Sequence, residues 1–193
     1  MKKLSTYLLL VLFSFSNLVH ADDVRDFEIE GISIGDSLLD HFSKKIIKKN
    51  KKDYYNNDKF TAVEFEDSIF KNYDGAQIHY KTKGDKYIIY ALDFVLLFEN
   101  NFDKCFKNQD QIVNDLSNTF TSLEMQKREN IKHPSDKSGN SNVTSVYLYF
   151  DSGDYASVEC YNWSEKMGFP DQLRVSITLQ ELSDWLNIPN IYK

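Results

Sequence analysis

Two short alternating segments in the last third of the chain constrain the fold more than any other feature of the sequence. In residues 146–150 and again in 156–160, every second residue is apolar. Asp151-Ser152-Gly153 between them suits a three-residue hairpin loop with glycine in the left-handed conformation. An odd loop places all the apolar side chains on one face, because a shift of one residue turns a strand over. They are Val146, Leu148, Phe150, Ala156, Val158 and Cys160.

The same register places a group of aromatic residues on the opposite face of this hairpin. Tyr147, Tyr149, Tyr155 and Tyr161 lie at the intervening positions, and Trp163 follows them closely. Tyrosine and tryptophan often anchor binding surfaces, since they combine a large area with a polar group. Tyrosine is also a good strand former on a half-exposed face, which is the alternative explanation. We therefore take these five residues as a candidate binding face.

Hydrophobic periodicity extends the prediction to the rest of the chain. Helices are expected over about 37–49 and 103–120, and strands over 61–65, 76–80, 87–98, 123–127 and 173–177. Thr178 and Glu181 resemble a capping box that opens a terminal helix. The predicted fold class is α+β, a two-layer sandwich with an antiparallel sheet and helices on one face. In this order of elements, a helix-then-strands unit occurs twice.

The first 21 residues have the pattern of a secretory signal peptide. Lys2 and Lys3 precede an apolar segment over 7–19, and Ala21 ends a cleavage site that is followed by two aspartates. The alternative is an uncleaved N-terminal anchor, which the short apolar segment disfavours. We predict cleavage after Ala21, export to the bacterial periplasm, and a mature single domain over 22–193.

Export changes the interpretation of the two cysteines, Cys105 and Cys160. In an oxidising compartment they are expected to form a disulfide, with two buried free thiols as the alternative. Such a bridge would close a loop of about 55 residues and add roughly 4 kcal/mol in the chain-entropy model. Cys160 lies on the apolar face of the hairpin and Cys105 on the apolar face of the second predicted helix.

Charge and motifs narrow the function classes. The chain carries a formal charge of −6, which disfavours nucleic acid as a partner. No nucleophile elbow, zinc-protease motif, P-loop or dinucleotide-binding motif is present. The remaining histidines after cleavage, His41, His79 and His133, lie far apart in sequence, and their spacing does not show whether they meet an acid. The sequence predicts neither a cofactor nor a metal, and it leans towards a non-enzymatic role.

One loop weakly resembles a calcium site. Asp136, Ser138 and Asn140 alternate as oxygen donors. However, Lys137 lies among them and the second half of an EF-hand pattern is missing. This pattern therefore does not change the prediction that no metal is bound.

Three segments carry a resemblance to a known group of proteins. They are residues 30–42 (EGISIGDSLLDHF), 143–155 (VTSVYLYFDSGDY) and 160–165 (CYNWSE). The chain resembles an uncharacterised exported family of AT-rich marine alphaproteobacteria, a resemblance that implies a periplasmic protein and brings no known activity. In topology alone it is also similar to β-lactamase-inhibitor-like and outer-membrane assembly-factor modules, and fold analogy does not establish function.

Two functional hypotheses follow from the sequence. The first is a non-enzymatic exported protein that binds an envelope protein or component through the tyrosine face. The second is a small-ligand-binding protein or an unrecognised hydrolase, for which His79 or His41 would have to meet carboxylates in a pocket. The sequence does not identify the partner, the ligand or the oligomeric state.

Overall fold

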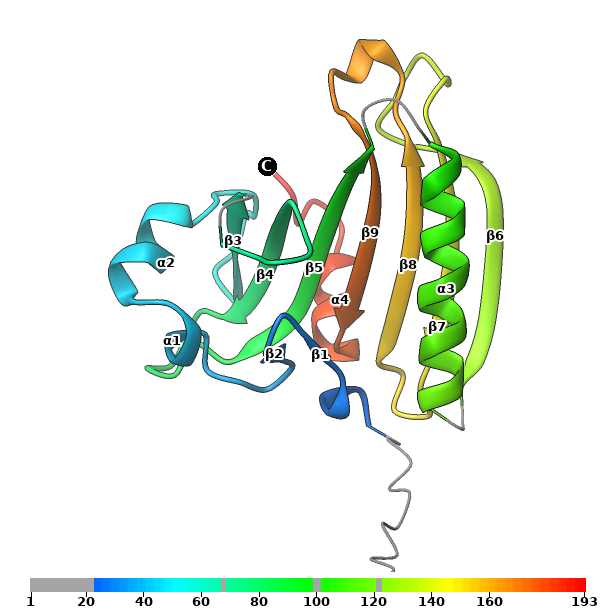
Figure 1. Ribbon diagram of the computed structural model, residues 1–193. Helices are drawn as coiled ribbons and strands as arrows, with labels where there is room; N and C mark the ends of the chain where they lie inside the picture. The colour runs from blue at the N-terminus through cyan, green and yellow to red at the C-terminus, as the bar shows by residue number, and fades with distance from the viewer. Residues whose placement is uncertain (1–22, 67–68, 99–101, 121–122) are drawn as a thin grey trace, which may run out of the picture.

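The computed structural model describes residues 23–66, 69–98, 102–120 and 123–193 (Figure 1). The predicted signal peptide and its cleavage site after Ala21 lie outside the described residues. Within the described part of the chain, no helix has both the length and the apolar character needed to cross a membrane.

A seven-stranded antiparallel sheet forms the centre of the molecule (Figure 1). Its spatial order is β3-β4-β5-β9-β8-β7-β6, so two groups of consecutive strands meet where β5 pairs with β9. With its helices, this sheet makes the chain mixed α+β, as predicted. The strands are β3 (Phe60–Glu66), β4 (Gly75–Lys81), β5 (Ile89–Phe98), β6 (Glu124–Lys132), β7 (Asn142–Tyr149), β8 (Tyr155–Asn162) and β9 (Asp171–Thr178).

The helices precede and follow these two groups of strands. The first group, β3 to β5, comes after α1 (Leu38–His41) and α2 (Lys44–Asn50). The second group, β6 to β9, comes after α3 (Asp103–Thr119), and α4 (Gln180–Leu186) follows it. The first group has three strands and the second has four.

The single helix predicted over 37–49 is wrong, because the chain breaks between α1 and α2. Phe42 is extended at this point, and its ring stacks on that of Phe65 with centroids 4.2 Å apart. Ser43 then starts α2 by accepting a hydrogen bond from the backbone N–H of Ile46. The packing of the Phe42 ring against β3 and the N-cap at Ser43 therefore outweigh the continuous helical periodicity of the apolar residues.

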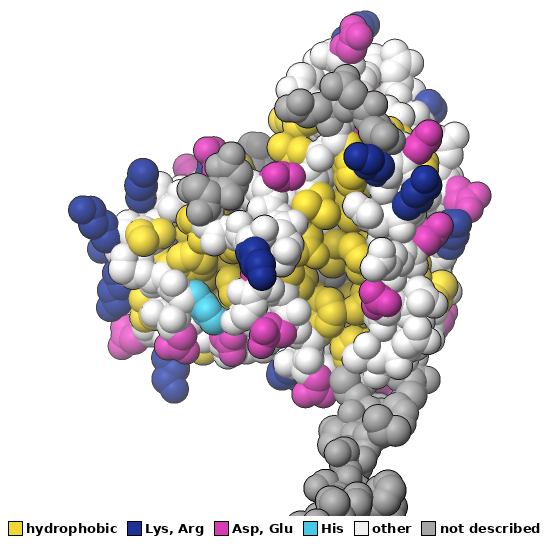
Figure 2. Space-filling model, viewed as in Figure 1, with side chains coloured by type: hydrophobic (Ala, Val, Ile, Leu, Met, Phe, Trp, Pro, Cys, Tyr) yellow, Lys and Arg dark blue, Asp and Glu magenta, His cyan; other side chains and the backbone are white. Residues whose placement is uncertain are grey.

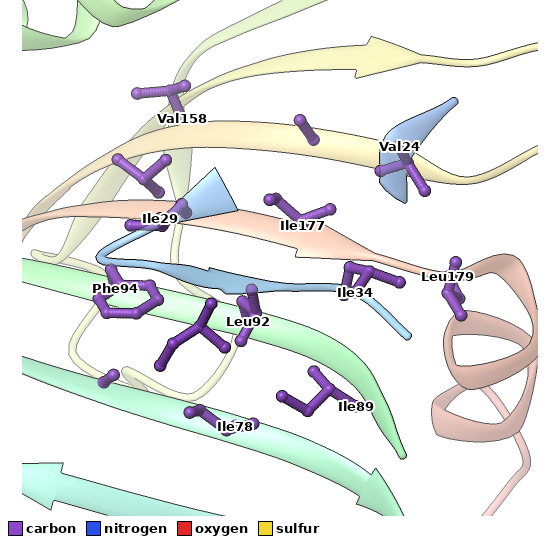
Figure 3. Close-up of a cluster of buried hydrophobic side chains, with 14 of the residues drawn as sticks. Val24, Ile29, Ile34, Ile78, Ile89, Leu92, Phe94, Val158, Ile177 and Leu179 are labelled. Carbon is purple, nitrogen blue, oxygen red and sulfur yellow. The ribbon is translucent and has the colours of Figure 1, made fainter. Parts of the chain in front are cut away.

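The main hydrophobic core lies on one face of the sheet. Aliphatic side chains from neighbouring strands point to this face, among them Ile78, Leu92, Ile177 and Val158 (Figure 3). A small hairpin of β1 (Glu28–Ile29) and β2 (Ile32–Ser33), preceded by the short helix η1 (Val24–Asp26), covers part of it. Hydrophobic side chains gather between this hairpin and α3 in Figure 2. We call the face of the sheet that carries this core the α3 face.

Helix α3 is attached to the α3 face by covalent and polar contacts. The sulfur atoms of Cys105 on α3 and Cys160 on β8 lie 1.99 Å apart, and both residues are fully buried. The predicted cysteine pair is therefore at disulfide distance. One turn further along, the amide Nε2 of Gln109 donates to the carbonyl oxygens of Thr144 and Val158 at 2.9 and 2.7 Å.

The terminal helix lies on the other face of the sheet, behind the strands in Figure 1. Leu182 and Trp185 of α4 pack in a second cluster with Phe60, Ala62 and Ala91 from β3 and β5. The expectation of helices on one face is therefore wrong for α4. We call this second face the α4 face. Strand β5 is covered on both faces only near its start, at Ala91; further along the α4 face Asp93 and Val95 are partly buried and Leu97 is exposed.

The β7–β8 hairpin has the register expected from its sequence. Leu148 pairs with Ala156 and Tyr149 with Tyr155. The backbone N–H of Phe150 then donates to the carbonyl of Asp154, which leaves a three-residue loop in which Gly153 has a φ of 85°. The six predicted apolar side chains are buried on the α3 face.

Candidate functional site

A pocket of about 540 Å³ lies on the α4 face, over the middle strands of the sheet. Alternate residues of β4, β5, β9 and β8 form its floor. Its walls come from residues 53–55, from α4 and from the C-terminal residues Tyr192 and Lys193. We call it the open-face pocket. It lies on the side turned away from the viewer in Figures 1 and 2.

Strand register explains why this floor is polar. Gln77, Asp93, Ser176, Ser157 and Tyr147 are partners of one another across β4, β5, β9, β8 and β7 in turn. Side chains on a strand point alternately to its two faces, so the neighbours of these residues in sequence point into the apolar core. The same alternation that builds the core on the α3 face therefore builds a row of polar groups on the α4 face.

Glu159 is a buried acid of the floor whose oxygens are already occupied. Its Oε1 accepts hydrogen bonds from the hydroxyls of Ser145 and Tyr147 at 2.8 and 2.9 Å, and its Oε2 accepts one from Tyr161 at 2.9 Å. Burial and the charge of Glu159 together raise the pKa of Tyr147 and of Tyr161. Both tyrosines are therefore neutral hydrogen-bond donors at physiological pH.

Arg174 lies directly opposite Glu159 on the neighbouring strand β9. Among the residues that the structure describes, its buried Nε has no hydrogen-bond partner and its guanidinium forms no ion pair with a carboxylate. The guanidinium carbon is 5.1 Å from the centre of the Tyr161 ring. Burial opposes its charge, but Tyr161, Asp93 and Glu159 outweigh it and raise the pKa of Arg174. Arg174 is thus a fixed, partly desolvated cation at the edge of a cavity.

His79 is only 4% exposed and lies in a short chain of polar groups. Its Nε2 is 2.6 Å from the hydroxyl of Tyr55. Its Nδ1 is 3.7 Å from Oδ2 of Asp93 and has no hydrogen-bond partner in the part of the chain that the structure describes. Asp93 in turn accepts a hydrogen bond from Ser176 at 2.6 Å through Oδ1. Burial lowers the pKa of His79 although Asp93 acts to raise it. The imidazole is therefore neutral at pH 7.

The wall of the pocket above β3 and β4 is held by contacts of the C-terminus. Nζ of Lys193 pairs with Oδ1 of Asp53 at 2.5 Å, and the backbone N–H of Lys193 donates to the carbonyl of Tyr54. The Tyr54 hydroxyl donates to Glu64 at 2.6 Å, and burial together with Glu64 raises the pKa of Tyr54 to about 12. These contacts join the last residue of the chain to a loop that precedes the sheet.

The predicted tyrosine face is divided between two places. Tyr147 and Tyr155 line the open-face pocket, and Tyr149 packs beside them with ring centroids 5.9 and 5.8 Å away. Tyr161 and Trp163 stack on each other at 5.4 Å towards the other end of the hairpin. Of these residues Tyr161 is buried and the other four are partly buried, so the face is less open than its sequence indicates.

The three histidines do not come together. His79 is in the pocket, whereas Nε2 of His41 is 3.1 Å from Oδ2 of Asp36 near α1. His133 lies in the loop after β6, with its ring 4.5 Å from that of Trp163. Only His79 therefore satisfies the requirement that a histidine lie near an acid inside a pocket.

Arg174, Asp93 and Glu159 are the charged residues of the pocket floor that the sequence interpretation missed. In residues 173–178, Arg174, Ser176 and Thr178 alternate with buried aliphatic residues, as the tyrosines do in the hairpin. Asp93 interrupts an otherwise apolar strand. Both signals were visible in the sequence, but the pairing of β5 with β9 that brings them together was not.

The loop that weakly resembles a calcium site is closed by its own hydrogen bonds. Asp136 accepts from the backbone N–H of Ser138 at 2.8 Å, from the N–H and hydroxyl of Ser141 at 2.8 and 2.6 Å, and from the hydroxyl of Ser164 at 2.8 Å. These donors hold the pKa of Asp136 far below its usual range. Among the described residues, no group of three or more His, Cys, Asp or Glu side chains could hold a metal ion.

Comparison with known protein families, with curated proteins and with solved structures finds no match to this chain. Functional inference therefore depends on the chemistry of the open-face pocket.

Proposed function

We propose that the chain is a non-enzymatic exported protein that binds a small ligand in the open-face pocket. One observation carries the proposal. The partly buried Arg174 and the buried His79 line the same cavity, and each has a buried nitrogen without a hydrogen-bond partner among the described residues. Buried polar atoms are rarely left unpaired in proteins, and a concentration of them in one cavity is typical of a site that awaits a ligand.

The shape and lining of the cavity support the same proposal. Its volume of about 540 Å³ is within the range of small-molecule sites, and polar groups on the floor face the apolar residues Leu182 and Leu186 of α4. Ligand sites usually combine apolar walls with a few directed polar groups. The predicted signal peptide and the cysteine pair support export. The order of helices followed by strands, which occurs before β3 to β5 and again before β6 to β9, supports the predicted repeat of a helix-then-strands unit.

Chemical-shift mapping tests this proposal directly. Isotopically labelled protein would be titrated with a library of amino acids, sugars and small carboxylates, and backbone amide shifts recorded. We expect at least one compound to shift the amides of Asp93, Arg174 and Ser176, and to lose this effect in Arg174→Gln. A library that shifts none of these amides would contradict the proposal.

A protein partner is the second candidate, and a specific observation favours it. Trp163 packs against Phe169 with centroids 5.2 Å apart, and Phe169 is 56% exposed. Exposed aromatic side chains of this kind often anchor protein interfaces. An envelope protein that shifts the amides around Trp163 and leaves those around Arg174 unchanged would favour this function over a small ligand.

A further inference from the structure

The polar atoms of the pocket that lack a hydrogen-bond partner among the described residues include both donors and an acceptor. The unpartnered groups include donors, at Nε of Arg174 and at Nδ1 of His79. We assign the histidine proton to Nδ1 because Asp93 lies on that side, so that the Tyr55 hydroxyl donates to Nε2. A ligand that completes this part of the site must bring an acceptor, and a carboxylate is the acceptor that a guanidinium binds best.

Asp93 supplies a hydrogen-bond acceptor that lacks a donor among the described residues. Its Oδ1 is occupied by Ser176, but its Oδ2 has only the distant Nδ1 of His79 nearby, at 3.7 Å. Among the described residues this oxygen accepts no hydrogen bond. Glu159, by contrast, already accepts three hydrogen bonds. A ligand that satisfies Asp93 must therefore bring a donor, and an ammonium group is the donor that best matches this partly buried carboxylate.

The net charge of the pocket floor favours a ligand that carries a carboxylate and an ammonium group together. Asp93, Glu159 and Arg174 together carry one net negative charge, while Asp53 and Lys193 neutralise each other at the rim. A simple anion would add a second uncompensated negative charge to a partly buried site. A simple cation would leave the donors of Arg174 and His79 unpaired.

We propose that the open-face pocket binds a small zwitterion with a carboxylate and an ammonium group, as in a free α-amino acid with an apolar or aromatic side chain. The carboxylate lies against Arg174 and His79, and the ammonium group against Asp93. The side chain lies against Leu182, Leu186 and the ring of Tyr155, which also line the pocket. This inference depends on the proposed function, since it names the class of ligand for the same site.

Three matched compounds separate the contributions of the two charges. L-Phenylalanine carries both charges, 3-phenylpropanoate lacks the ammonium group, and 2-phenylethylamine lacks the carboxylate. Titration calorimetry with the purified protein at pH 7 should give an affinity for L-phenylalanine at least 10-fold higher than for either analogue, about the effect of one charge-assisted hydrogen bond. An analogue that binds as tightly as L-phenylalanine, or no binding of all three, overturns the inference.

Two substitutions assign the charges to residues. Arg174→Gln should remove the preference for L-phenylalanine over 2-phenylethylamine, and Asp93→Asn the preference over 3-phenylpropanoate. Arg25→Gln and Asp110→Asn are matched controls, because both residues are exposed and lie outside the pocket lining. Both preferences should remain in the controls. Preferences that survive in Arg174→Gln and Asp93→Asn would contradict the assignment.

The test also distinguishes failure of this inference from failure of the proposed function. If the three phenyl compounds do not bind but a library compound other than an amino acid shifts the amides of the pocket, the pocket binds a ligand of different chemistry. If no compound shifts those amides, the proposed function fails as well. The comparison of compounds on the unsubstituted protein remains decisive even if a variant does not fold.

Discussion

Removing the cysteine pair should weaken the fold by an amount that the structure allows us to work out. Cys105 and Cys160 are 55 residues apart in sequence, and a cross-link that closes such a loop restricts the unfolded chain. The chain-entropy relation for a loop of this length gives about 4 kcal/mol at 25 °C. Domains commonly have a net stability of only about 5–15 kcal/mol. We therefore expect the double variant Cys105→Ala/Cys160→Ala to lose a large share of its stability.

Two features of the structure affect this estimate in opposite directions. Both cysteines are fully buried between α3 and β8, so alanine also removes packed sulfur atoms from the core. The contacts of Gln109 with the sheet remain in the variant, so α3 should still dock. The expected result is a folded protein with a midpoint of thermal unfolding lowered by about 10 °C for a chain of this size.

Urea unfolding followed by tryptophan fluorescence measures the effect, because Trp163 and Trp185 lie in different parts of the fold. The free energy of unfolding should fall by about 4 kcal/mol, and the dependence on urea should steepen because the unfolded chain expands. Reductant should lower the stability of the parent protein and leave that of the variant unchanged. A loss below about 1 kcal/mol, or equal sensitivity of both proteins to reductant, would refute the reasoning.

Three further predictions concern buried polar residues. Burial lowers the pKa of His79, so the unfolded chain takes up this proton before the folded chain does as pH falls below about 6.5. The free energy of unfolding should then decline by up to about 1.4 kcal/mol per pH unit. In urea titrations at about pH 7, 6 and 5, His79→Gln should show a shallower decline than the parent protein. Equal slopes would exclude this origin. Gln109→Met should cost about 1–3 kcal/mol in the free energy of unfolding, since two hydrogen bonds to the sheet are lost; an unchanged urea midpoint would contradict it. Asp136→Asn should lower the midpoint of thermal unfolding and accelerate proteolysis within residues 133–141, whereas Asp151→Asn, in an exposed turn, should do neither.

Local patterns in the sequence were sufficient for the β7–β8 hairpin. The alternation on either side of Asp151-Ser152-Gly153 predicts the observed pairing, because the loop length and the side of each residue depend on neighbours along the chain. Cys105 and Cys160 were placed on facing apolar surfaces by the same reasoning. The aliphatic positions of the core follow from it as well.

Helix ends depended on residues that are distant in sequence. Thr178 and Glu181 resemble a capping box, but α4 begins at Gln180, and its first backbone N–H donates to Oδ1 of Asp154, the residue that follows the hairpin loop, at 2.8 Å. Glu181 instead pairs with Lys59 and Lys81. A carboxylate from the residue just before β8 therefore replaces the local cap.

The sequence by itself determined which residues of each strand are apolar, and hence which side chains share a face. Only the tertiary structure decided that β5 pairs with β9, which places Asp93 beside Ser176 and brings Arg174, Glu159 and His79 to one pocket. The physical reason is that periodicity is a property of one segment, whereas strand order follows from how all the segments together bury their apolar faces. A pocket built across four strands therefore has no signature in any one of them.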